Sequence, residues 1–80
     1  MSFPGLTSTL SVNGQVFSVQ TESTQDEIRT VIFLGGESIL RVSTPYDEDL
    51  HLMALIRLGQ KQHQSIEKRC ARGEFCRAEG

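Results

Sequence analysis

The 80-residue chain has no tryptophan, two prolines, two cysteines and few aromatic residues, namely four phenylalanines and one tyrosine. Cys70 and Cys76 are too few for the disulfide framework of a small secreted domain. No apolar run approaches the roughly 20 residues that cross a bilayer, and the first residues lack the basic and apolar regions of a signal peptide. The sequence therefore predicts a cytoplasmic protein that does not bind a membrane.

Patterns typical of catalysis and of cofactor binding are also missing. The two histidines and ten acidic residues form no zinc-protease, calcium-binding or paired-carboxylate pattern. Gly35-Gly36 is not followed by the helix start that a phosphate-binding loop needs. His51, beside the acidic residues 47–49, is interpreted as part of a solvated first helical turn. We expect no enzyme activity, no catalytic residues, no cofactor and no metal site.

A formal net charge of −2 favours neither nucleic acid nor a membrane surface as a partner. The basic residues near the C-terminus are explained by a solvated helix face and by the negative end of the helix dipole. They are Arg57, Lys61, Lys68, Arg69 and Arg72. We therefore expect no nucleic-acid partner, although a small nucleic-acid-binding regulator remains the third and weakest hypothesis.

What remains is an ordinary globular composition, with 38% hydrophobic residues. A chain of this length buries only about 60% of the surface of its unfolded form, so support from a partner is expected. The sequence predicts one domain over residues 1–80. It consists of a loose lead-in at 1–6, an antiparallel sheet at 7–43, a helix at 44–73 and a flexible tail at 74–80.

Residues 7–21 alternate between apolar and polar side chains around Asn13-Gly14, which strongly favours a two-residue type I′ hairpin turn. This turn predicts that Val12 pairs with Gln15 and Leu10 with Phe17. One face of the hairpin is then apolar, and turn chemistry and alternation agree on the register.

A polar connection at 22–27 leads to a second hairpin around Gly35-Gly36. Its first arm, residues 31–34, is apolar on both faces, as expected of a central strand covered on more than one side. A two-residue turn places Ile32 beside Ile39, whereas a bulged three-residue turn places it beside Leu40. Both registers stay open.

A long amphipathic helix is predicted to follow. Thr44 is the expected N-cap and Pro45 the first helical residue, while Gly73 suits the left-handed residue that ends a helix. The apolar face is Leu52, Ile56, Gly59, His63, Ile66 and Cys70. The chain is thus predicted to be an α+β fold, a four-stranded antiparallel sheet of two β-hairpins with one long C-terminal α-helix packed on one face.

Such a helix would be about 39 Å long, whereas strands of six or seven residues reach only about 20–23 Å. We therefore expect the second half of the helix to overhang the sheet and to pack against a second copy, forming a homodimer. The predicted interaction residues are Gly59, His63, Ile66, Cys70 and Phe75. In the alternative, Gly59 breaks the helix and the second half folds back onto its own domain.

His63 and Cys70 share a helix face, but seven helical residues span about 10.5 Å, too far for one zinc ion or for a direct hydrogen bond. Only a symmetric partner could complete a site. The alternative function is therefore a thiol- or metal-responsive sensor that uses His63, Cys70 and Cys76 across a dimer.

Several short motifs resemble a small module of delta-proteobacterial proteins, a β-meander followed by a helix, found alone or beside signalling domains. These motifs are Asn13-Gly14, Val19-Gln20-Thr21-Glu22, Ile32-Phe33-Leu34-Gly35-Gly36, Ser43-Thr44-Pro45-Tyr46, Gln62-His63 and Arg72-Gly73-Glu74-Phe75. The resemblance covers about residues 12–75 and implies a regulatory or adaptor role in a bacterial cytoplasm. The leading hypothesis is a non-catalytic protein–protein interaction module with a protein partner.

Overall fold

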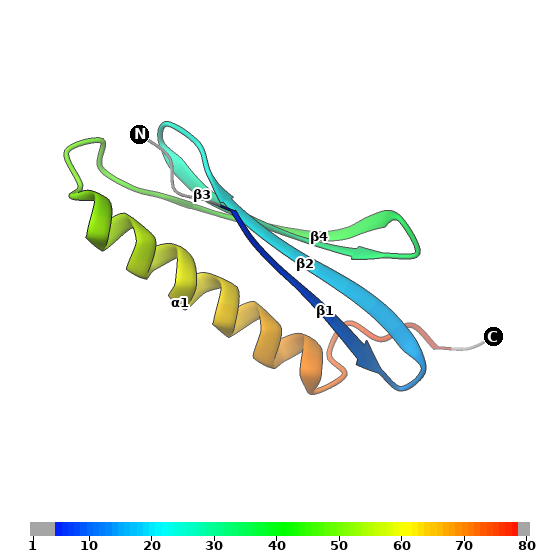
Figure 1. Ribbon diagram of the computed structural model, residues 1–80. Coiled ribbons are helices and arrows are strands. Elements are labelled where there is room, and N and C mark those ends of the chain that lie inside the picture. The colour runs from blue at the N-terminus through cyan, green and yellow to red at the C-terminus, as the bar shows by residue number, and fades with distance from the viewer. Residues whose placement is uncertain (1–4, 79–80) are drawn as a thin grey trace.

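Four β-strands and one α-helix follow one another in the computed structural model, which describes residues 5–78. The elements are β1 (Leu6–Val12), β2 (Gln15–Ser23), β3 (Glu27–Leu34), β4 (Glu37–Pro45) and α1 (Leu52–Ala71). The strands form one antiparallel sheet in the order β1-β2-β3-β4, and α1 lies along one of its faces (Figure 1). The predicted α+β fold is confirmed. Most of the predicted lead-in, residues 1–4, lies outside the described residues.

The first hairpin has the predicted register, with Val12 opposite Gln15 and Leu10 opposite Phe17. Asn13 and Gly14 have φ angles of 52° and 77°, as a type I′ turn requires at both central positions. Alternate residues of β2 are buried, because one face of the strand is turned toward α1.

The second hairpin combines features of both predicted registers. Its turn has two residues, since Leu34 lies opposite Glu37 and Phe33 opposite Ser38. A β-bulge then leaves Ile39 without an opposite residue and places Ile32 beside Leu40. The bulge therefore lies in β4, beyond the turn.

The predicted start of the helix is wrong. Thr44 and Pro45 belong to β4, opposite Ile28 and Glu27, and proline is tolerated there because β4 is an edge strand. The chain then turns, and α1 starts after His51, whose Nδ1 accepts a hydrogen bond from the Met53 amide at 3.3 Å. No acidic residue lies in the first turn of α1, so residues 47–49 form the preceding loop.

The end of the helix is as predicted, but the tail is not free. Arg72 is the C-cap and Gly73 has a φ of 82°. Beyond it, the Phe75 ring lies 5.0 Å from the Arg69 guanidinium carbon. The Gln15 side-chain amide donates to the Arg77 carbonyl at 2.7 Å and accepts from the Arg77 backbone N–H at 2.9 Å. Residues 74–77 are thus fixed against the sheet, while residues 79–80 lie outside the described part.

The predicted overhang does not exist, because the helix is shorter and the strands are longer than predicted. The 20 residues of α1 span about 30 Å, and strands of seven to nine residues span about 23–31 Å. The helix continues through Gly59, which is buried. Both halves of α1 therefore find their apolar surface within the same chain.

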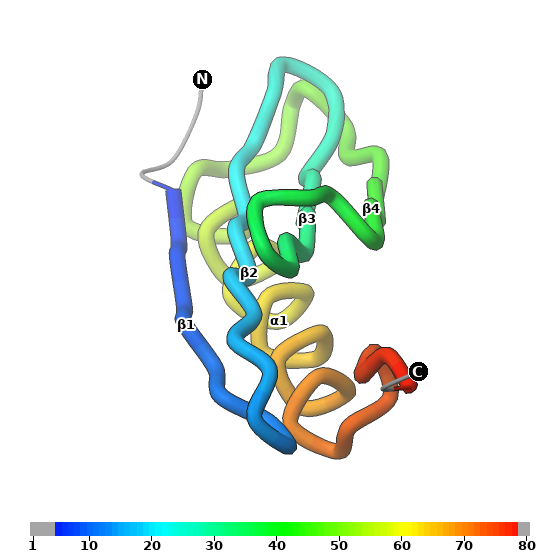
Figure 2. The backbone as a smooth tube through the Cα atoms, turned by 90° about the vertical axis from the view of Figure 1, so that its right-hand side faces the viewer, coloured from blue at the N-terminus to red at the C-terminus, as the bar shows by residue number. Residues whose placement is uncertain are grey.

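The core consists of two apolar clusters between α1 and the sheet. The larger cluster contains Phe17, Val19, Ile32, Ile66 and Cys70, and the smaller one contains Ile28 and Leu55. In residues 5–78, the backbone of α1 lies close to β1, β2 and β3, whereas α1 meets β4 through side chains alone (Figure 2). The helix is therefore displaced toward the β1 edge of the sheet.

Candidate functional site

The residues predicted to form an interaction surface lie inside the chain. His63 and Ile66 are each 4% exposed, Cys70 is fully buried and Gly59 is buried, while Phe75 is half-buried against the larger cluster. The second half of α1 is thus covered by the sheet. A partner was expected here because the helix was predicted to overhang the sheet, and without the overhang that reason no longer applies.

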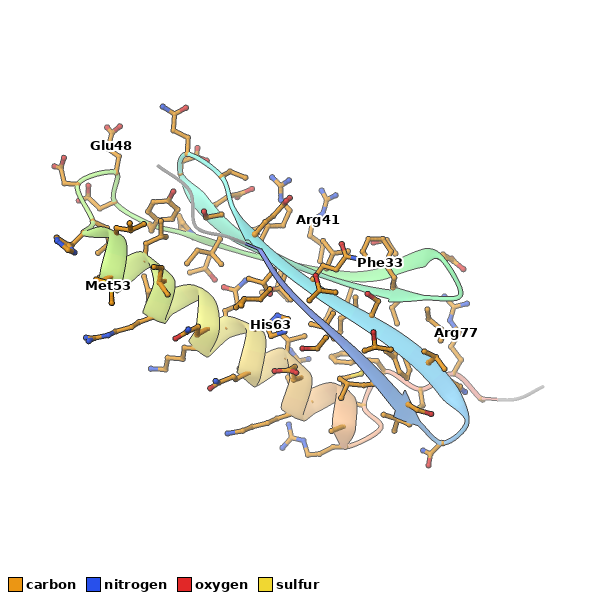
Figure 3. The ribbon with its side chains drawn as sticks, in the orientation of Figure 1. Phe33, Arg41, Glu48, Met53, His63 and Arg77 are labelled. Atoms are coloured by element: carbon orange, nitrogen blue, oxygen red, sulfur yellow. The ribbon has the colours of Figure 1, made fainter. Side chains whose placement is uncertain are left out.

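His63 is the centre of a buried polar group instead. It projects from α1 toward the sheet (Figure 3). Its Nε2 is hydrogen-bonded to the Ser8 hydroxyl at 2.8 Å, and its Nδ1 to the Thr21 hydroxyl at 2.7 Å. Thr21 is in turn bonded to the Thr30 hydroxyl at 2.7 Å. Because hydroxyl groups both donate and accept, either tautomer of the neutral ring can be satisfied.

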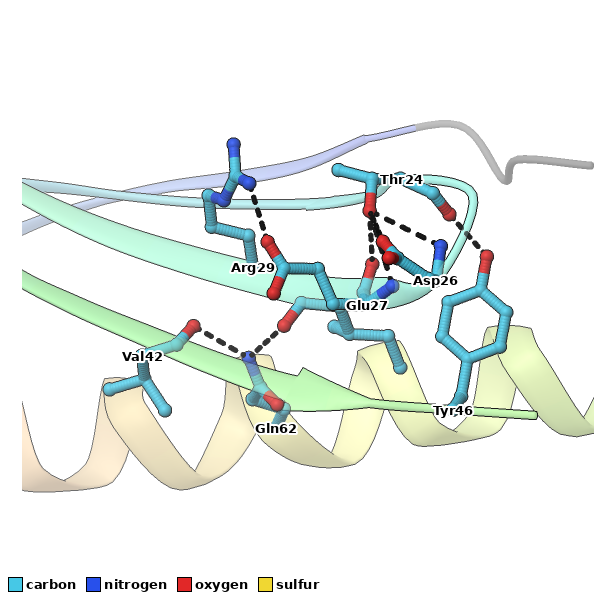
Figure 4. Close-up of polar contacts among 8 residues, drawn as sticks. Thr24, Asp26, Glu27, Arg29, Val42, Tyr46 and Gln62 are labelled. Atoms are coloured by element: carbon cyan, nitrogen blue, oxygen red, sulfur yellow. Dashed lines mark hydrogen bonds and ion pairs between the residues drawn. The ribbon is translucent and has the colours of Figure 1, made fainter. Parts of the chain in front are cut away.

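Gln62 extends these contacts to β4. Its amide nitrogen donates to the carbonyls of Ile28 and Val42, each at 3.3 Å (Figure 4). It also donates to the Thr30 hydroxyl at 3.0 Å. The Thr44 hydroxyl donates to the Gln62 side-chain oxygen at 2.6 Å. This polar layer lies between the two apolar clusters and fixes how α1 sits on the sheet. Its saturated hydrogen bonding is typical of a structural role.

The state of the two thiols bears on the sensor alternative, which stays a prediction. Cys70 and Cys76 are both free, and burial raises the pKa of the Cys70 thiol, with a smaller contribution from Cys76. A raised pKa keeps the thiol protonated, whereas thiol reactivity and metal binding need the thiolate. Within residues 5–78 there is no group of three or more His, Cys, Asp or Glu that could hold a metal ion.

The face of the sheet opposite α1 carries the features that sequence reasoning left unused. Phe33 of β3 and Arg41 of β4 point away from the helix (Figure 3). A shallow hollow of about 360 Å³ lies on this face, and its lining includes Gln20, Arg29, Val31, Phe33 and Arg41. We call it the open-face hollow.

The chemistry of the open-face hollow combines apolar surface with unused cationic donors. Arg29 forms an ion pair with Glu27, and this hydrogen bond and charge raise the pKa of the guanidinium. Its Nε atom is nevertheless buried and has no hydrogen-bond partner. Arg41 takes part in none of the ion pairs of residues 5–78. Such a surface is suited to an apolar group that carries a carboxylate.

One sequence signal pointed to this surface. The run Val31-Ile32-Phe33-Leu34 predicted that β3 is covered on both faces, and α1 covers only the Ile32 face. Within the described chain, no segment lies over Val31 and Phe33, both of which are half-buried by their neighbours in the sheet. The contribution of Arg41 was missed, because a single arginine in a strand carries no pattern.

Fold and site together define a small α+β protein with one sheet face open. Comparisons with protein families, with curated proteins and with solved structures find no match for this chain. The resemblance to a delta-proteobacterial module therefore stays a prediction. In the described residues, no helix is long and apolar enough to cross a membrane.

Proposed function

We propose that the chain is a non-catalytic protein-interaction module that binds an acidic, partly apolar segment of a partner protein in the open-face hollow. The observation that carries this proposal is the uncovered outer face of β3, where Val31 and Phe33 lie beside Arg41. An aromatic side chain near a cation is a common anchor of protein interfaces. The cytoplasmic location, the bacterial origin and the regulatory role stay predictions.

Charge supports an acidic partner. Arg41 is exposed and takes part in none of the ion pairs of residues 5–78, so a carboxylate bound here would meet a guanidinium that is otherwise unpaired. Glu22 also lines the hollow and discourages a ligand with several negative charges at that end. A segment with one carboxylate beside an aliphatic or aromatic side chain fits best.

A second hollow, between α1 and β4, is less suited to a partner. Its lining includes Val42, Leu58, Lys61, Gln62 and Ile66. Gln62 bridges the helix to both β3 and β4 through its own hydrogen bonds, so the chain already connects the two walls. Lys61 on this side provides a matched cation for control experiments.

The test is selection of linear peptides from a random phage-displayed library on the immobilised chain, followed by affinity measurement. We expect selected peptides to carry a carboxylate near an apolar residue. Phe33→Ser and Arg41→Gln should each weaken binding by about tenfold or more, whereas Lys61→Gln should leave it unchanged. The Arg41→Gln variant keeps the test valid if Phe33→Ser fails to fold.

Three outcomes would overturn the proposal. They are an absence of selected peptides, binding that responds to Lys61→Gln and not to Arg41→Gln, and amide shifts in NMR spectra that map to α1. A requirement for Cys70 and Cys76, shown by lost binding in a Cys70→Ala/Cys76→Ala chain, would favour the thiol-sensor alternative. Salt-sensitive retention on DNA or RNA would favour the nucleic-acid alternative.

A further inference from the structure

The two edges of the sheet differ in how well they are protected against pairing with another strand. The β4 edge carries Glu37 and Arg41, ends at Pro45 and is interrupted by the bulge at Ile39. Charges, proline and bulges are the devices that keep an edge from pairing. By contrast, β1 reads Leu-Thr-Ser-Thr-Leu-Ser-Val, with no charge, no proline and an unbroken register with β2.

The outer edge of β1 is free within residues 5–78. In this part of the chain β1 pairs only with β2, and β1 forms one border of the sheet (Figure 2). Its exposed side chains, Thr7, Thr9 and Ser11, are small hydroxyl residues, two of them β-branched. The backbone N–H and C=O groups on the outer side of this seven-residue strand thus form a ready template for strand addition.

We propose that a second copy of this chain occupies this edge, through antiparallel pairing of the two β1 strands about a two-fold axis at Thr9. The sequence of β1 is nearly symmetric about that residue. Leu6 would lie opposite the partner's Val12, Thr7 opposite the partner's Ser11, and Thr9 opposite the partner's Thr9. Apolar residues meet apolar ones and hydroxyls meet hydroxyls at these positions, as in a self-complementary interface, whereas Ser8 would lie opposite the partner's Leu10.

Charge favours β1 over β4 as the self-pairing edge. The seven residues of β1 carry no formal charge, so pairing sets no like charges opposite each other. A β4 pair centred on its middle residue would instead place two Arg41 guanidiniums face to face. The chain therefore permits self-pairing at one edge and opposes it at the other.

The position of α1 fits the same arrangement. Since α1 lies over β1, β2 and β3, and strands are about 4.8 Å apart, the two helix axes would lie about 10–14 Å apart. That distance is close to the diameter of a helix with its side chains, about 10–12 Å, so the helices would touch without overlapping. Both helices lie on the same side of the joined sheet, because residue pairing about Thr9 keeps inward residues opposite inward residues.

An exposed apolar side chain lies on the flank of α1 that would face the partner helix. Ile56 is two helical turns before His63, which contacts β1 through Ser8, and Met53 is one turn earlier on that flank. Met53 is 53% exposed. A strip formed by β1 and this flank buries on the order of 1,000 Å² in total, at the low end of specific interfaces, so a dimer of micromolar affinity is expected.

This interface shares Leu6 and Thr7 with the lining of the open-face hollow. Peptide binding is tested at Phe33 and Arg41, which lie outside β1, so failure of the dimer leaves the proposed function standing. The test is molar mass by sedimentation equilibrium between about 10 µM and about 500 µM, a range that suits a weak dimer. We expect dimer formation by the unaltered chain and a monomer for Thr9→Lys, which places two ammonium groups together at the axis. Ser43→Lys, an exposed change on the β4 edge, should leave the dimer intact.

Amide hydrogen exchange of the unaltered chain supplies a measurement without a variant. Outward-pointing amides of β1 should exchange more slowly as the concentration rises, while those of the β4 edge should not. A strict monomer throughout the range, or a dimer that survives Thr9→Lys, overturns the β1 interface. Peptide binding by Arg41→Gln is measured separately and reports only on the open-face hollow.

Discussion

At the scale of single residues, His63 shows how one buried polar side chain organises the core. Ser8 of β1 and Thr21 of β2 are hydrogen-bonded to its ring, and Thr30 of β3 is hydrogen-bonded to Thr21. Glu67 lies farther away, 3.8 Å from Nε2. Sequence reasoning interpreted His63 as an interface residue because its partners are threonines and a serine far away in the sequence, which carry no pattern of their own.

Replacing Thr21 by valine should destabilise the fold. The change keeps the shape but removes the hydroxyl that bonds both His63 and Thr30, so two buried polar groups lose a partner at a cost of about 1–3 kcal/mol. Thr7→Val, on the exposed face of β1, should change the free energy of unfolding by less than about 0.5 kcal/mol. Urea unfolding measures both, and equal stabilities of the two variants would show that the polar layer contributes no net stability.

Cys70 should make stability fall at alkaline pH. Burial raises the pKa of its thiol in the folded chain, whereas the unfolded thiol ionises in the ordinary range of roughly 8.5 to 9. Above that range the unfolded state binds fewer protons than the folded state, so the free energy of unfolding decreases as pH rises. The stability that this thiol contributes is fully present below that range.

The measurement compares the unaltered chain with Cys70→Ala, which lacks the thiol. We expect the difference in free energy of unfolding to stay constant from about pH 6 to 7.5 and to shrink from about pH 8.5 to 10. Subtracting the two curves removes the titration of all other groups they share. A difference that stays constant across the whole range would contradict the assigned cause.

At the scale of secondary structure, sequence reasoning succeeded where local chemistry and periodicity agree. Asn13-Gly14 and the alternation around it fixed one register, and the structure has that register. The second hairpin was left with two registers because the bulge at Ile39 depends on how β4 packs, not on its turn. The helix start was wrong because Thr44-Pro45 is equally suited to the end of an edge strand.

The C-terminal end of α1 is a local feature that a substitution can test. Gly73 has a φ of 82°, where an alanine is strained, and its added Cβ would lie 3.5 Å from the Asn13 side chain. Gly73→Ala should therefore lower the free energy of unfolding by about 1–2 kcal/mol. Thermal and urea unfolding measure the change.

Gly5→Ala is the matched control for Gly73→Ala. Its Cβ would be 3.4 Å from the Thr21 carbonyl oxygen, an ordinary contact, and its φ is not in the left-handed range. The same substitution is therefore expected to be neutral or slightly stabilising there, because it restricts the unfolded chain. If both variants lost the same stability, the loss at Gly73 would not come from backbone conformation.

At the scale of the whole molecule, the predicted overhang of the helix was wrong because the lengths of the helix and strands were wrong. Starting the helix at Thr44 instead of His51 added residues to α1, and ending the strands early shortened the sheet. The predicted helix was therefore too long and the predicted strands too short, and both errors made the helix exceed the sheet. The open surface is the outer face of β3, and the apolar run at residues 31–34 indicated that this strand has two apolar faces. Which of the two faces α1 leaves uncovered depends on three-dimensional packing.

The shape of the molecule makes the proposed dimer testable by X-ray scattering. One chain is an elongated body of 47 × 18 × 17 Å with a Cα radius of gyration of 13.4 Å. Antiparallel β1 pairing sets two such bodies side by side, about one width apart, which raises the radius of gyration only to about 16 Å. An end-to-end dimer, with centres about one length apart, would have about 27 Å. Scattering at the concentration where sedimentation shows a dimer therefore separates the two arrangements, and a value near the larger figure would contradict pairing through β1.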